Sequence, residues 1–61
     1  MIIKEERQRL GWTQTDLSYH SRVPAAEISR IESGRLKPST RQIERIAKAL
    51  GVKPEIFTQR D

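Results

Sequence analysis

The chain contains no cysteine and a single histidine, His20, among its 61 residues. Disulfides and thiolate metal sites are therefore excluded, and one imidazole cannot build a multi-histidine metal cage. Only three residues are aromatic, and no apolar run approaches the roughly 20 residues that a membrane-spanning helix needs. Because nothing resembles a signal peptide either, the cytoplasm is the expected location and no membrane contact is expected.

The short length also limits the function. A chain of this size, taken as one domain over residues 1–61, buries too little apolar surface for both a core and a deep catalytic cleft. No nucleophile, metal partner or pocket accompanies the carboxylates of Asp16 and Glu27. We therefore expect a protein that is not an enzyme and that uses no cofactor, no metal and no small-molecule ligand.

Positive charge is concentrated in the second half of the chain. Segment 30–53 holds seven Lys and Arg residues against two acidic ones, whereas segment 1–29 holds four of each kind. A local excess of cations is the electrostatic footprint of a nucleic-acid-binding surface. A solvated surface that keeps the chain soluble explains the same charge equally well, so charge alone does not decide between these two readings.

Apolar spacing and capping signals predict two helices in the first third of the chain. Ile3, Arg7 and Leu10 are spaced to lie on one face of a helix over residues 2–10. Thr13 is a helix N-cap, and the helix that follows it is expected to end near residue 20.

A tight turn over residues 21–24 separates the second helix from a third. Pro24 disfavours a helical residue before it but fits the first turn of a new helix. The third helix is expected over residues 25–33 and should end at Gly34, because glycine is best suited to a left-handed cap. Two short helices joined in this way predict a helix-turn-helix unit, whose second helix enters the major groove of DNA. The apolar contacts expected inside the unit are Leu17, Val23, Ile28 and Ile31.

The last third of the chain predicts two further helices. Ser39 and Gln42 form a capping box at the start of a fourth helix, which Gly51 ends. The inner face of this helix is traced by Ile43, Ile46, Ala47 and Leu50. Residues 54–57 begin a short fifth helix. The predicted fold class is therefore all-α, a compact five-helix bundle.

The chain resembles the Cro and phage-repressor type of helix-turn-helix protein, also called the XRE family, over nearly its whole length. The matching positions are Arg7, Leu10–Gln14, Leu17, Val23, Ile28–Gly34, Pro38–Ser39 and Ile46–Val52. The resemblance implies a lambda-repressor-like five-helix domain that binds double-stranded DNA in a sequence-specific way. The expected function is regulation of transcription, as a repressor, with residues 25–33 in the major groove.

The resemblance also implies two groups of DNA contacts. Base readout is expected on the outer face of the third helix, from Ala25, Ala26, Glu27, Ser29 and Arg30. Arg30 is the leading candidate because its guanidinium can bond O6 and N7 of guanine together, while an alanine methyl can contact the methyl of thymine. Glu27 fits two roles, accepting from N4 of cytosine or repelling phosphate. Phosphate contacts are expected from Thr13, Gln14, Ser33, Arg35, Lys37 and Arg41, among which Gln14 also braces the recognition helix.

Other positions are structural by the same resemblance. Arg7 and Glu32 match a pair that forms a salt bridge between the first helix and the end of the third, and an arginine facing the core is costly unless a carboxylate meets it. Arg22 stands where the family turn usually has Gly or Asn, so a positive φ is expected at a cost of about 1 kcal/mol. Pro24 removes the side-chain cap that a Ser or Thr would supply to the third helix.

Several residues keep two interpretations. Trp12 and Tyr19 are interpreted as packing residues rather than as stacking platforms for single-stranded nucleic acid, and His20 as a surface residue. Ile56 and Phe57 either complete the core or form the two-fold interface of a homodimer that spans two half-sites about 34 Å apart. We favour the homodimer and, with it, a palindromic operator.

Two rival functions use the same fold. One is a protein-interaction module that has lost DNA binding, which the absence of Gln or Asn at Ala25 and Ala26 favours. The other is an antitoxin or a restriction-modification controller, which would use the same DNA site.

Overall fold

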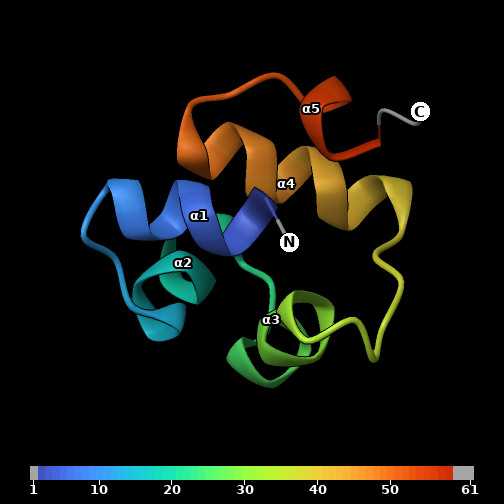
Figure 1. Ribbon diagram of the computed structural model, residues 1–61, viewed down its shortest axis with the longest axis horizontal. Helices are drawn as coiled ribbons and strands as arrows, with labels where there is room; N and C mark the ends of the chain where they lie inside the picture. Colours follow the sequence, from blue (N-terminus) through green and yellow to red (C-terminus); the bar gives the residue numbers. More distant parts are fainter. Residues whose placement is uncertain (1, 59–61) are drawn as a thin grey trace.

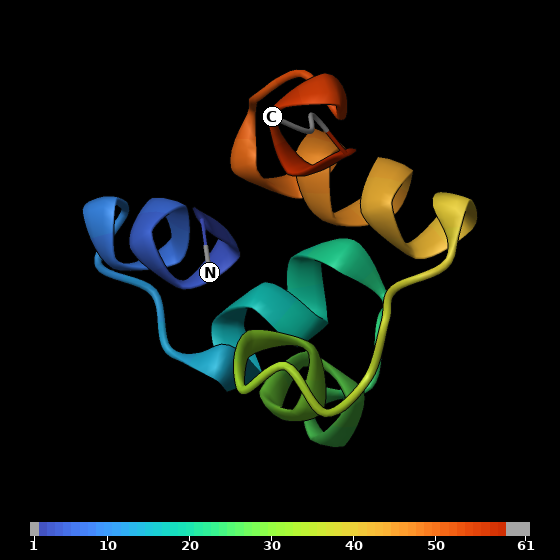
Figure 2. The ribbon, with the colours of Figure 1, turned by 45° about the vertical axis from the view of Figure 1, so that its right-hand side comes forward.

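The computed structural model describes residues 2–58, and all regular secondary structure in this part of the chain is helical. The helices are α1 (Ile2–Arg9), α2 (Gln14–Ser21), α3 (Ala25–Glu32), α4 (Thr40–Leu50) and α5 (Glu55–Thr58). The longest helix, α4, packs against α1, α2 and α5, while α3 packs against α2. Figures 1 and 2 show α3 at one edge of the molecule and α5 at the opposite edge. The predicted all-α fold with its five helices is confirmed over these residues.

The core lies where the inner faces of the helices meet. Its fully packed members are Ile3, Leu17, Val23, Ile28, Ile31, Ile46 and Leu50, and the half-buried side chains of Trp12, Leu36, Ala49, Val52 and Phe57 pack against them. Burial of one such Ile or Leu side chain stabilises the folded state by about 1.5–3 kcal/mol. Because α2 contributes Leu17 and α3 contributes Ile28 and Ile31, the core fixes how these two helices lie against each other.

Capping boxes start α2 and α4. The hydroxyl of Thr13 accepts from the amide of Asp16 at 3.0 Å, and the Asp16 carboxylate accepts from the amide of Thr13 at 2.9 Å. Ser39 and Gln42 exchange the equivalent bonds at 3.1 and 2.9 Å, as the sequence predicts. Each box satisfies two amides that lack a helical partner. The hydrogen bonds from the backbone and side chain of Thr13 also hold the pKa of Asp16 below its ordinary value.

The turn between α2 and α3 carries the expected strain. Arg22 lies in the left-handed region with φ 61° and ψ 29°, and its amide donates to the carbonyl of Ser18 at 2.8 Å. Among residues 2–58 it is the only residue other than glycine with a positive φ. Pro24 precedes α3 without a side-chain cap, and its carbonyl accepts from the amides of Glu27 and Ile28 at 3.0 Å. The structure thus confirms the positive φ of Arg22 and the missing side-chain cap at Pro24.

Two predictions about apolar side chains are wrong. The face of the first helix was expected to include Leu10, but α1 ends at Arg9 and Leu10 is 38% exposed. The amide of Leu10 donates to the carbonyl of Arg7, a tighter spacing than in an α-helix, so the chain turns and carries Leu10 off the buried face. Tyr19 is 81% exposed and does not pack in the core. Its position in α2 faces away from Leu17, because residues two apart on a helix do not share a face.

The other aromatic predictions hold. Trp12 is half-buried and packs against the core, and His20 is exposed near the end of α2. The rings of Trp12 and His20 also stack, with centroids 4.4 Å apart and planes 15° from parallel, a contact that the spacing of the two residues does not predict. The edge of Tyr19 also contacts His20, with ring centroids 5.2 Å apart. His20 therefore contacts both of the other rings.

Candidate nucleic-acid interface

The outer side of α3 is an exposed stripe formed by Ala26, Ser29, Arg30 and Ser33. These positions are spaced at i, i+3, i+4 and i+7, so they lie on one helical face, opposite the buried Ile28 and Ile31. Ala25 and Glu27, also expected to read bases, are half-buried at the flanks of this stripe. Helix α3 lies at an edge of the molecule (Figure 2). Because Ile28 and Ile31 are buried, the stripe of small and cationic side chains on the opposite side of α3 faces outward.

The side chains of Ser29 and Arg30 have no hydrogen bond or ion pair with any residue in segment 2–58. Ser33 donates its hydroxyl to the carbonyl of Arg30 at 3.1 Å, which closes the last turn of α3. Small neighbours leave the backbone of α3 accessible to another surface, and Arg30 is the single long side chain of the stripe. The stripe therefore offers one bidentate hydrogen-bond donor among side chains too short to block a close approach.

Glu27 lies at the junction between α3 and α4. Its carboxylate accepts a short hydrogen bond from the side-chain amide of Gln42, whose oxygen already accepts from the amide of Ser39. Gln42 thus caps α4 and binds α3 at once, because a carboxamide carries both an acceptor and donors. The sequence predicted the capping bond but not the contact with Glu27. The role of Glu27 in base readout remains a prediction.

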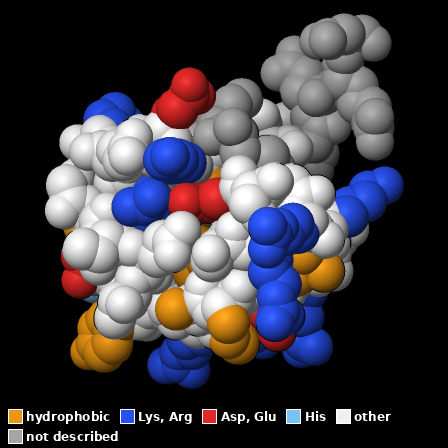
Figure 3. All heavy atoms as spheres, turned by 60° about the horizontal axis from the view of Figure 1, so that its bottom comes forward, with side chains coloured by type: hydrophobic (Ala, Val, Ile, Leu, Met, Phe, Trp, Pro, Cys, Tyr) orange, Lys and Arg blue, Asp and Glu red, His pale blue; other side chains and the backbone are white. Residues whose placement is uncertain are grey.

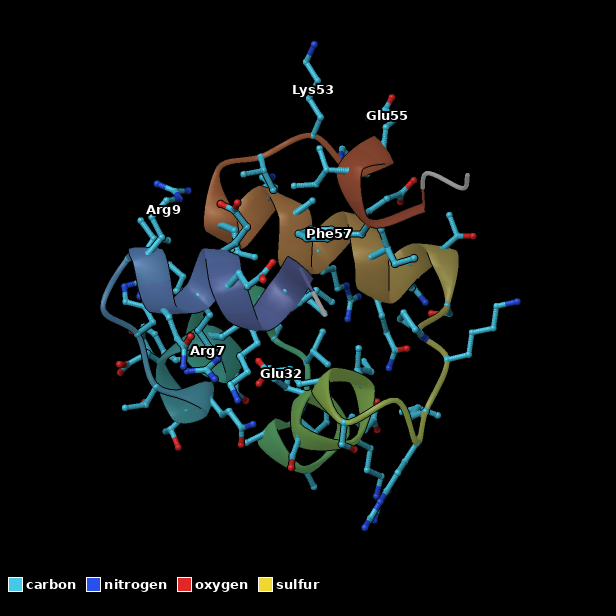
Figure 4. All side chains as sticks on the ribbon, viewed as in Figure 1. Arg7, Arg9, Glu32, Lys53, Glu55 and Phe57 are labelled. Carbon is cyan, nitrogen blue, oxygen red and sulfur yellow. The ribbon has the colours of Figure 1, made fainter. Side chains whose placement is uncertain are left out.

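Arg7 and Glu32 join α1 to the end of α3 (Figure 4). Nε of Arg7 donates to Oε2 of Glu32 at 2.8 Å, and Nη2 donates to Oε1 at 3.0 Å. The exposed fractions of the two side chains are 9% and 4%. Nη1 of Arg7 also donates to the carbonyl of Trp12 at 2.7 Å, and Nε2 of the Gln14 side chain donates to Oε1 of Glu32 at 3.1 Å. This polar network, made of Arg7, Trp12, Gln14 and Glu32, fixes the end of α3 relative to α1 and the start of α2.

The network also sets the charge of its two ionisable members. The hydrogen bond to Glu32 raises the pKa of Arg7, against the opposing effect of burial. Burial by itself raises the pKa of Glu32, but the hydrogen bonds from Arg7 and Gln14 and the charge of Arg7 outweigh it and lower that pKa. Both side chains therefore stay charged at neutral pH, and no buried side-chain polar atom of the described residues lacks a hydrogen bond.

The residues expected to hold phosphates lie on three segments that flank α3. Thr13 and Gln14 start α2, Arg35 and Lys37 lie in the loop between α3 and α4, and Arg41 is in the first turn of α4. All are exposed except Gln14, which is half-buried because it reaches Glu32. A carboxamide has two N–H donors, so one donor of Gln14 remains for another acceptor.

The face that carries α3 is displayed in Figure 3. Lys and Arg side chains are spread over it and gather most densely along its right-hand side, next to small hydrophobic patches, while acidic side chains are sparse. A surface of this kind attracts a polyanion over a distance of about a Debye length.

Residues 2–58 offer neither a metal site nor a membrane span. No group of three or more His, Asp or Glu side chains there is arranged to hold a metal ion. Likewise, none of the helices in the described segment combines the length and the apolar composition needed to cross a bilayer.

Comparison with known proteins agrees with this geometry. Residues 3–57 match the protein family described as "Helix-turn-helix". The chain is 42% identical over 50 residues to a protein of Methanothermobacter thermautotrophicus named "Uncharacterized HTH-type transcriptional regulator". That alignment covers 82% of this chain and 72% of the other protein. No solved structure matches the chain significantly.

Proposed function

Since this chain belongs to the helix-turn-helix family of Cro and phage-repressor proteins, we propose that it binds double-stranded DNA in the cytoplasm and represses transcription by occupying an operator. The observation that carries the proposal is the exposed stripe of α3, whose outward side chains are small or cationic and leave Arg30 without a partner in residues 2–58. In the bound state α3 lies in the major groove.

Within the groove, Arg30 supplies the main base contact. Its guanidinium donates to O6 and N7 of guanine together, a contact that gives about 1–3 kcal/mol of discrimination against other bases. The methyl groups of Ala25 and Ala26 contact thymine methyls, and the hydroxyl of Ser29 bonds a neighbouring base edge. Glu27 accepts from cytosine or repels phosphate, and its bond to Gln42 limits how far its carboxylate can move.

Phosphates on both sides of the groove bind the flanking segments. The residues assigned to this role are Thr13, Gln14, Ser33, Arg35, Lys37 and Arg41. These contacts contribute affinity and register without sequence information. Because Gln14 also donates to Glu32, a phosphate held by its second N–H would be linked directly to the end of α3.

We further propose that the protein binds a palindromic operator as a homodimer. The sequence predicts this interface at Ile56 and Phe57. Phe57 packs on the core and points from α5 toward α4, as Figure 4 shows. The half-buried Ile56 is the better candidate for contact with a second copy.

Selection of binding sites from random duplexes tests the proposal. A DNA-binding repressor should enrich one sequence, and a dimer should enrich an inverted repeat with half-sites about 34 Å apart. The affinity should fall steeply with salt. The logarithm of the association constant should decrease with the logarithm of the salt concentration by a slope of about 0.9 for each phosphate contact. No association with any duplex at low salt would contradict DNA binding and leave the protein-interaction module. If the selected site controls a toxin or a restriction enzyme, the protein is the antitoxin or controller instead of a general repressor.

A further inference from the structure

A second cationic surface lies between the end of α2 and the second half of α4. Three residues of α2 and its cap, His20, Ser21 and Arg22, line a hollow of about 590 Å³ together with Arg45, Lys48 and Ala49 of α4. None of these six belongs to the residues assigned to DNA, and none is acidic. The hollow therefore has a basic lining that the proposed DNA-binding function leaves without a role.

The shape of the hollow follows from side-chain size. Ser21 is buried, and its hydroxyl accepts from the amide of Val23 at 3.3 Å. Ala49 is half-buried against the core. These two short side chains leave a recess, while the long side chains of Arg45 and Lys48, three apart on α4, share one helical face beside it. Ser21 and Ala49 thus form the floor of the hollow, and the cations Arg22, Arg45 and Lys48 form its rim.

The cations of the rim have no internal partner. Arg22, Arg45 and Lys48 are exposed, and within residues 2–58 none of them pairs with a carboxylate. The stacking of His20 on Trp12 holds the imidazole in place at the border, where a ring N–H can donate to an acceptor. Like charges that line one hollow repel one another, and a bound anion would offset that repulsion.

The backbone of Arg22 is a separate observation. Its left-handed conformation, with φ 61°, is one that glycine or asparagine adopts more easily than arginine. The chain nevertheless has at this point a long cationic side chain that lines the hollow. Backbone strain of this kind is found most often at functional sites. Because the exposed side chain of Arg22 does not pack in the core, a binding role would explain why arginine occupies this position.

We propose that this hollow binds a small, multiply charged anion that carries phosphate groups, such as an inorganic or nucleoside triphosphate. Guanidinium and ammonium groups are the usual partners of phosphate oxygens, because charge-assisted hydrogen bonds are stronger than neutral ones. The volume also lies within the range of sites that take small ligands. The site is independent of the proposed DNA-binding face and does not require that function to be correct.

Titration of the ¹⁵N-labelled protein with inorganic triphosphate, at an ionic strength held constant with sodium chloride, tests the proposal. We expect saturable amide shifts confined to residues 20–22 and 45–49. The double substitution Arg45→Gln with Lys48→Gln should weaken binding at least tenfold. Arg22→Gly should also weaken it several-fold while keeping the fold, because glycine accepts the left-handed backbone. Lys53→Gln, which removes one charge outside the hollow, is the matched control and should leave the affinity within twofold.

Four outcomes would overturn the proposal. Sodium chloride alone could reproduce the shifts, which would show ionic strength rather than binding. The shifts could instead fall on α3 and the loop after it. Lys53→Gln could weaken binding as much as the double substitution does. Finally, a duplex oligonucleotide could produce the same shifts at residues 20–22 and 45–49 and displace triphosphate, which would make the hollow a DNA contact.

Discussion

The guanidinium of Arg7 and the carboxylate of Glu32, 25 residues apart in the sequence, face each other in two hydrogen bonds of 2.8 and 3.0 Å. This bidentate pair is nearly closed to solvent. Arg7 donates a further hydrogen bond to the carbonyl of Trp12, and Glu32 accepts one from the side chain of Gln14. Charge that is removed from water in this way stabilises the fold only while both partners are present.

Removal of the carboxylate should therefore be costly. We expect Glu32→Ala to destabilise the protein by about 3 kcal/mol, because it leaves the buried charge of Arg7 without its partner. Glu6→Ala is the control, since it breaks an Arg–Glu pair whose side chains are 55% and 24% exposed. An exposed pair contributes about 0–1 kcal/mol. Urea unfolding followed by circular dichroism measures both, and equal losses in the two variants would contradict the role of the network.

The same pair predicts how stability depends on pH. The pKa of Glu32 is lowered in the folded state, so its contribution is present above the unfolded value of about 4.5 and is lost as pH falls through the folded pKa. The stability difference between the natural protein and Glu32→Gln should thus be largest near pH 7 and should shrink below pH of about 4.5. Asp16 also loses stabilisation in acid, but equally in both proteins. A difference that stays constant from pH 7 to pH 3 would refute this account.

The contact of Gln42 with Glu27 predicts an unusual result for a capping residue. In an isolated helix, glutamate serves in a capping box as well as glutamine does. Here Gln42→Glu keeps the acceptor for Ser39 but places a carboxylate against that of Glu27, so we expect a loss of about 1 kcal/mol at pH 7. The loss should disappear in the double variant with Glu27→Gln. Thermal unfolding of Gln42→Glu, Glu27→Gln and the double variant would show this, and a Gln42→Glu protein as stable as the natural one would count against the contact.

Two substitutions separate base readout from phosphate binding. Arg30→Ala should relax the preference at one base pair by about 1–3 kcal/mol while changing affinity for random DNA less. Lys37→Ala should weaken binding to all duplexes alike. It should also reduce the slope of the logarithm of affinity against the logarithm of salt concentration by about 0.9. Both side chains are exposed, so neither change should disturb folding. Fluorescence anisotropy with selected and random duplexes distinguishes them, and equal losses on both duplexes for Arg30→Ala would remove it from readout.

Relief of the strained turn should stabilise the fold. We expect Arg22→Gly to raise stability by about 0.5–1 kcal/mol, since the cost of a left-handed arginine exceeds the extra chain entropy of glycine. For a domain of this size that corresponds to a rise of about 2–8 °C in Tm. Arg22→Ala keeps the left-handed penalty and should give no such rise. A lower Tm for the glycine variant would contradict the strain inferred here.

Most of the fold could be predicted because local signals agree with the tertiary structure. Capping residues set the starts of α2 and α4 within a residue, and a left-handed Gly34, with φ 81°, follows α3 as expected. The errors came where tertiary geometry decides. Leu10 left its predicted face because the chain turns one residue early, and Tyr19 is exposed although its residue type favours packing. The spacing of apolar residues alone predicts neither the exposure of Leu10 nor that of Tyr19.

The candidate site was predictable only in part. The spacing of residues around Ile28 and Ile31 indicates which side of α3 faces outward. It does not reveal that Glu27 binds Gln42, because that contact joins residues 15 apart on two different helices. The cationic hollow is similarly invisible in the sequence, since residues 20–22 and 45–49 meet only after α2 has packed against α4.

The outward side chains of α3 can be exchanged at little cost to the fold. In residues 2–58 the side chains of Ala26, Ser29 and Arg30 bind nothing within the protein, so new residues there should leave the folding equilibrium almost untouched. Under the proposed function, substitutions at these positions would therefore change the preferred operator without requiring compensating changes in the core.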